Sequence, residues 1–222
     1  PRTLLMGIAV MGAFMTLAFW LGRPRYRLAV GLSVLVQGGA GLVLQVVLIL
    51  AFQIVVGFAY LQLALILAFF MAGLATGTWA VGLLRARWQL SSHAISWLAG
   101  LQVAVTILPL ALLGLLNLGA QGWFHQLSPP AVSGVFTTLS FVAGALGGSH
   151  FSLAVLASAA TGARVGPIGG YLYAVDLAGA AIGALGAGLL ILPLFGIPSS
   201  LGLLSLLSLV CLLSMARRPR TI

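Results

Sequence analysis

The sequence predicts an all-α integral membrane protein, a polytopic bundle of about seven transmembrane helices with a cytoplasmic C-terminus. Hydrophobic residues make up 62% of the 222 positions, charged residues make up 5%, and the mean hydropathy is +1.22. Soluble domains contain roughly 25% charged residues, so this composition excludes a soluble fold. The apolar residues also form separate runs, each near the roughly 20 residues that a helix needs to cross a bilayer.

Seven apolar segments are long enough to cross the membrane. The first is interpreted as a spanning helix and not as a signal peptide, because its apolar run is long and no small-residue cleavage site precedes the basic cluster at 23–27. The second is longer than a bilayer requires, which predicts tilt or protrusion. Pro109 should kink the fourth, and Pro193 and Pro198 bracket a tight turn between the last two. The segments span residues 4–21, 28–57, 60–84, 94–118, 135–160, 170–194 and 199–215.

The arginines support this division of the chain. If the seven helices alternate in direction, nine of the ten arginines fall on one side of the membrane and only Arg2 falls on the other. Because positive residues are retained on the cytoplasmic side, the arginine-rich side is predicted to be cytoplasmic. Residues 1–27 then form the first helix and a basic linker, and residues 28–222 form a six-helix membrane domain. On the opposite side, Trp123 and Phe124 are expected to lie in the headgroup region.

The charge and the metal-ligating residues exclude several other classes. A net charge of +9 would suggest a nucleic-acid partner for a soluble protein, but here the arginines lie in short clusters between apolar segments and are interpreted as topology signals. The single cysteine, Cys211, lies inside an apolar segment and supports neither a disulfide nor a metal site. Only one of the three histidines, His150, lies deep in a helix, which disfavours a haem held by two histidines of this chain. The sequence therefore predicts no nucleic-acid partner, no metal and no cofactor bound by this chain alone.

Small residues at intervals of four predict close helix packing, because association in lipid depends on the approach of backbones. The sixth segment has this pattern and also carries Asp176, the only acidic residue in the sequence, which is expected to face protein. Residues 70–78 (FMAGLATGT) resemble residues 141–149 (FVAGALGGS), although low-complexity apolar sequence also produces such matches. The glycines expected at helix contacts are Gly73, Gly77, Gly144, Gly148, Gly179, Gly183 and Gly188.

Three segments together resemble a known family. Residues 38–47 (GGAGLVLQVV), 70–77 (FMAGLATG) and 171–183 (YLYAVDLAGAAIG) are similar to the membrane domain of bacterial spermidine-synthase-like integral membrane proteins. That family is often described as a fusion of a membrane part like those of the major facilitator superfamily (MFS) with a spermidine synthase. The resemblance covers most of residues 28–215 and implies a bacterial cytoplasmic membrane protein.

The chain also departs from this family. The family usually places an aromatic residue and an arginine after its Gln or Glu, whereas Gln45 is followed by three aliphatic residues. The soluble synthase domain is absent. Aminopropyl transfer needs carboxylates that bind cationic amines and take up a proton, and one aspartate cannot supply them. This chain alone is therefore not expected to be an enzyme, and no residue is predicted to be catalytic.

Polar residues on four helices are predicted to meet inside the membrane. At a rise of about 1.5 Å per residue, Gln37, Thr76, His150 and Asp176 lie at similar depths from the cytoplasmic ends of their helices. Polar groups in hydrocarbon are costly unless they are paired. The hypothesis is a proton-exchanging or headgroup-binding cluster of His150 and Asp176. The alternative is structural, with both side chains satisfied by neighbouring backbone groups. The supporting residues in the hypothesis are Gln37, Thr76, Thr78 and Ser149.

The function predicted from these features is that of a membrane module. It anchors a partner protein or a soluble domain, and binding or passage of a small, mainly apolar substrate is included in the prediction. One alternative is a subunit of a redox complex whose His150 and Asp176 exchange protons with a quinone. The other is a purely structural scaffold subunit. The predicted partners are the lipid bilayer and other protein subunits or a soluble domain.

Overall fold

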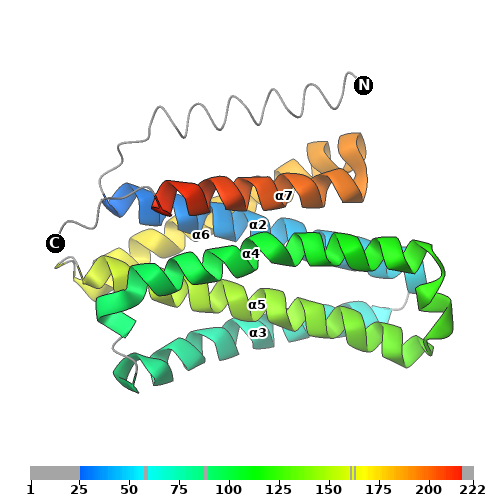
Figure 1. Ribbon diagram of the computed structural model, residues 1–222, viewed down its shortest axis with the longest axis horizontal. Coiled ribbons are helices and arrows are strands. Elements are labelled where there is room, and N and C mark those ends of the chain that lie inside the picture. The colour runs from blue at the N-terminus through cyan, green and yellow to red at the C-terminus, as the bar shows by residue number, and fades with distance from the viewer. Residues whose placement is uncertain (1–25, 58–59, 88–89, 161, 163, 217–222) are drawn as a thin grey trace.

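The computed structural model describes residues 26–57, 60–87, 90–160, 162 and 164–216. These residues are almost entirely helical and include no strand. Long helices lie along one common direction, with their connections at the two ends of the bundle (Figure 1). The helices are α2 (Tyr26–Val56), α3 (Tyr60–Arg87), α4 (Leu90–Ala120), the 3-10 helix η1 (Trp123–Gln126), α5 (Pro129–Ala159), α6 (Val165–Gly186), the π-helical turn η2 (Ala187–Ile191) and α7 (Leu192–Ala216).

Five segments of the described chain are long and apolar enough to cross a membrane. The last of them, Val165–Leu213, is 49 residues long and reverses at Gly196, whose φ of 72° and ψ of 177° are not helical. Glycine adopts such a positive φ without steric cost. As a result α6 and α7 run in opposite directions (Figure 1), with the turn between Pro193 and Pro198 as the sequence predicts. The expected helix at 4–21 lies outside the described residues, so the count of seven stays a prediction.

The connection between α4 and α5 is shorter than the sequence predicts. Pro129 and Pro130 begin α5 and do not lie in a loop, because proline fits the first turn of a helix, where a backbone N–H has no helical partner. Phe124 points into the bundle. Its ring is 8% exposed and lies 6.0 Å from the ring of Phe136, whereas Trp123 is 36% exposed. The inward position of Phe124 closes this end of the bundle.

The described arginines lie at one end of the bundle, the left end in Figure 1, which we call the arginine end. There α2, α4 and α6 begin and α3 and α5 end, so Arg27, Arg85, Arg87 and Arg164 belong to the same end. Arg85 and Arg164 are exposed. The other six arginines of the sequence lie outside the described residues.

Two apolar clusters form the core. The larger lies away from the arginine end and includes Phe52 and Phe136, whose rings meet edge to face at 5.5 Å. The smaller lies toward the arginine end and includes Val30, Leu98 and Leu153. The closest helix pairs are α3 with α5, α2 with α6, and α4 with α7.

Candidate functional site

Several polar residues lie at the level along the bundle where the two apolar clusters meet. On α2, Gln37 falls between Val34 and Ala40, and on α5, His150 falls between Ala143 and Leu153. On α3, Thr76 and Thr78 fall between Phe70 and Val81, and on α4, Gln102 falls between Leu98 and Leu112, so these residues lie at similar levels along the bundle. We call this layer the polar belt. It comprises Gln37, Thr76, Thr78, Gln102, Ser149, His150, Asp176 and Ser208.

His150 is the centre of a hydrogen-bonded chain that joins three helices. Its side chain is fully buried, and its Nε2 lies 3.0 Å from Gln102 Oε1 on α4. Gln102 Nε2 in turn donates a hydrogen bond of 3.2 Å to the Ser208 backbone carbonyl on α7. An interhelical hydrogen bond in a membrane protein contributes about 0.6 kcal/mol on average and up to about 1.7 kcal/mol. These two hydrogen bonds therefore link α4, α5 and α7.

This chain of hydrogen bonds also determines the tautomer of His150. Because the Gln102 amide nitrogen donates to a carbonyl, its oxygen is the atom that faces the imidazole. An amide oxygen only accepts hydrogen bonds, so His150 Nε2 carries the proton. His150 Nδ1 is then an acceptor, and it is buried without a partner among the described residues.

We expect nitrogen NMR of the labelled protein in bilayers to show this tautomer directly. In a variant with His93→Gln and His125→Gln, which leaves one of the three histidines, Nε2 should resonate as protonated and Nδ1 as unprotonated. Gln102→Leu should remove the preference, because Nε2 loses its acceptor. A protonated Nδ1 in the parent would contradict the assignment.

Two of the three hydroxyl residues of the hypothesis serve the contact between α3 and α5. Thr78 Oγ1 donates to the Gly148 carbonyl at 3.3 Å, and Ser149 Oγ donates to the Gly77 carbonyl at 3.2 Å. Thr76 Oγ1 bonds to carbonyls of its own helix. These hydroxyls are therefore not arranged around His150.

The contact between α3 and α5 is reciprocal. A side chain at Gly73 would meet the Phe141 carbonyl, and a side chain at Gly144 would meet the Phe70 carbonyl. Gly77 faces the Ala145 carbonyl in the same way that Gly148 faces the Leu74 carbonyl. Each of these contacts from α3 to α5 is repeated from α5 to α3 by the residues at the equivalent positions of the two similar segments. Segments 70–78 and 141–149 therefore form a locally two-fold symmetric pair of parallel helices.

Asp176 lies at the contact between α6 and α2. Its side chain is half-buried, and its Oδ1 and backbone carbonyl lie against the backbone at Gly38. No hydrogen bond or ion pair joins this carboxylate to another described residue. Because His150 bonds to Gln102 and Asp176 lies against α2, the structure does not pair the two groups by a hydrogen bond.

The predicted packing glycines of α6 divide into two groups. Gly179 lies against the Leu35 carbonyl, and Gly183 lies against Gly39. Gly188 differs, because the space around it is open. It lies in the π-helical turn, where the wider turn changes the register and takes Gly188 away from α2.

The sequence hypothesis missed Gln102 and Ser208 as members of the polar belt. Gln102 is fully buried and is the partner of His150. The same count of residues from the helix end that selects Gln37 would have selected Gln102. Ser208 contributes a backbone carbonyl, which no side-chain pattern reveals.

Comparison with known proteins gives no family for this chain. No family model, no curated protein and no solved structure matches it. The resemblance to spermidine-synthase-like membrane proteins therefore stays an expectation from the sequence. Among the described residues, no group of three or more His, Cys, Asp or Glu side chains is placed to hold a metal ion.

Proposed function

We propose that this chain is a multi-pass membrane module of the bacterial cytoplasmic membrane that anchors a partner protein or a soluble domain. The C-terminus and the arginine end of the bundle face the cytoplasm in this proposal. The proposal assigns no reaction to the chain itself. A domain of the spermidine-synthase type is the partner that the sequence resemblance suggests.

The use of the polar side chains inside the bundle is the observation that carries this proposal. His150, Gln102 and the Ser208 carbonyl hold three helices together, and Ser140 Oγ donates to Gln45 Oε1 at 2.9 Å and lies 2.7 Å from the Ile66 carbonyl. These hydrogen bonds join neighbouring helices, which is a structural use of the polar side chains. A rigid module is the role that such an interior serves best.

The exposed guanidinium groups favour the arginine end as the anchoring face. Arg85 ends α3 and Arg164 precedes α6, and both are exposed. Positively charged connections are retained in the cytoplasm, where a soluble synthase domain would also reside. The quinone alternative draws less support, because it needs His150 and Asp176 in one site and their contacts lie on different helix pairs.

Photo-crosslinking in native membranes tests the proposal. We expect reactive residues placed at Arg85 and at Arg164 to capture the same soluble polypeptide. Reactive residues at Tyr60 and Trp123, at the opposite end, should not capture it. The captured polypeptide should also remain with the chain through purification.

Two outcomes would contradict the proposal. One is a chain that purifies alone from native membranes and gives no crosslink from the arginine end. The other is capture of the same soluble polypeptide from Tyr60 and Trp123 only. A quinone in the lipid extract of the purified protein, reduced in amount by His150→Leu, would favour the redox alternative.

A further inference from the structure

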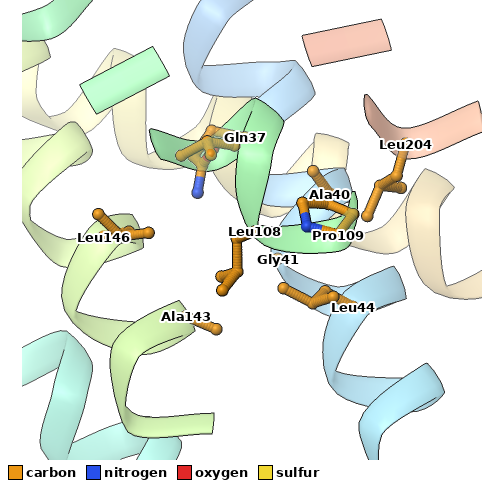
Figure 2. A pocket seen from close by; sticks show the side chains of 10 residues that line it. Gln37, Ala40, Gly41, Leu44, Leu108, Pro109, Ala143, Leu146 and Leu204 are labelled. Atoms are coloured by element: carbon orange, nitrogen blue, oxygen red, sulfur yellow. The ribbon is translucent and has the colours of Figure 1, made fainter. Parts of the chain in front are cut away.

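A small cavity lies inside the bundle beside the proline of α4. Its volume is about 20 Å³, and its walls come from α2, α4, α5 and α7. Most of the walls are aliphatic, with Leu146, Ala143 and Leu204 among them (Figure 2). The polar side chain in the wall is Gln37 of the polar belt.

The Gln37 carboxamide is not satisfied by the protein. The side chain is 7% exposed, and its Oε1 is buried without a hydrogen-bond partner among the described residues. Figure 2 shows the amide nitrogen directed into the space between Leu108 and Leu146. This amide nitrogen also has no hydrogen-bond partner among the described residues. A buried donor without a partner costs about 1–3 kcal/mol, so the position favours a bound acceptor.

Pro109 supplies a second unsatisfied group at the same cavity. Proline has no backbone N–H, so the helical hydrogen bond to the carbonyl four residues earlier cannot form. That carbonyl belongs to Val105, and both Val105 and Pro109 line the cavity. A residue of the wall therefore has a carbonyl oxygen without its helical donor, in addition to the Gln37 amide.

We infer that the cavity holds one water molecule, which joins the Gln37 carboxamide to the Val105 carbonyl oxygen. The water accepts a hydrogen bond from the Gln37 amide and donates one to the Val105 oxygen. A water needs at least about 10–15 Å³ of such volume and at least two polar partners, and this cavity provides both. The interrupted turn of α4 is thereby hydrated inside the bundle.

The sequence allows one carbonyl to be labelled alone. Val105–Thr106 is the only Val-Thr pair in the chain, so carbonyl-¹³C valine with ¹⁵N threonine selects that single peptide bond. In the full chain in phospholipid bilayers, magnetisation transferred from water protons should reach the Val105 carbonyl by solid-state NMR. Valine with ¹⁵N alanine labels Val103 and Val142, whose side chains are exposed; Val103 is the control carbonyl in every variant, because Ala143→Leu removes the labelled pair at Val142.

Two substitutions should remove the water signal at Val105 by different routes. Ala143→Leu fills the cavity, and Pro109→Ala restores the N–H that Val105 accepts. Gly114→Ala, on the same helix with open space at its Cβ position, should leave the signal unchanged. Loss of the signal to the level of the Val103 carbonyl in both variants supports the site. A parent protein whose Val105 carbonyl receives no more water magnetisation than Val103 and Val142 overturns the inference, as does a signal that persists in both variants.

Discussion

Replacing Gly144 by leucine is expected to prevent α3 and α5 from packing. The first carbon of the new side chain would overlap the Phe70 carbonyl of α3 and crowd the Leu74 amide. These are backbone atoms, which cannot move aside as a flexible side chain can. Overpacking usually costs about 1–3 kcal/mol, and a contact with backbone belongs at or above the upper end. Thermal unfolding in detergent, with the recovered monodisperse fraction, measures the effect.

Gly82→Leu is the matched control for this substitution. Gly82 lies on α3 with open space at its Cβ position, so the same change in volume and helix propensity should have little effect. The local symmetry adds a stricter expectation. Gly73→Ala and Gly144→Ala should destabilise the bundle equally, because each side chain meets the equivalent carbonyl. A stable Gly144→Leu protein would show that the two helices do not touch as described.

Gln102→Leu is expected to have the second largest effect. The substitution removes the acceptor of His150 Nε2 and the donor of the Ser208 carbonyl. The Ser208 carbonyl keeps the N–H donor of its own helix, so His150 Nε2 is the buried group left without a partner, and the free energy of unfolding should fall by about 1–3 kcal/mol. Stability measured by reversible unfolding in mixed micelles gives this difference.

A double-mutant cycle separates the hydrogen bond from the change in volume. His150→Leu alone leaves Gln102 Oε1 buried without its partner, whereas Gln102→Leu with His150→Leu removes both groups. The double variant should therefore be destabilised by less than the sum of the two single variants. His125→Leu, in the exposed turn η1, is the control for a histidine outside the network. Additive losses would show that His150 and Gln102 do not interact.

Much of the helical architecture was predictable from hydrophobicity alone. Segments such as 28–57 and 60–84 are uniformly apolar and close to the required length, so their ends agree with α2 and α3 within a few residues. The turn at Gly196 was also predictable, because Pro193 and Pro198 cannot both continue one regular helix. The start of α5 was not, since two adjacent prolines are compatible with a loop and with a first helical turn.

For the polar belt, the sequence predicts the level of each residue along its helix but not the neighbour that each side chain faces. Counting residues from the helix ends gives the depth of Gln37, His150 and Asp176, and the structure agrees with it. Depth does not give rotation about the helix axis, which decides that His150 faces Gln102 and that Asp176 faces Gly38. If one helix were rotated by half a turn about its axis, these side chains would face other helices. The positions of the apolar segments in the sequence would be the same.

The reciprocal contact of α3 and α5 has a consequence for biosynthesis. The two helices are separated in the chain by the whole of α4, so α3 is inserted into the membrane well before its partner has been synthesised. Until α5 has been inserted, the α3 surface at Gly73 and Gly77, which has no side chains, is accessible to lipid or to any other helix with small residues. This surface of α3 therefore lacks its partner for as long as residues 90–160 take to be synthesised.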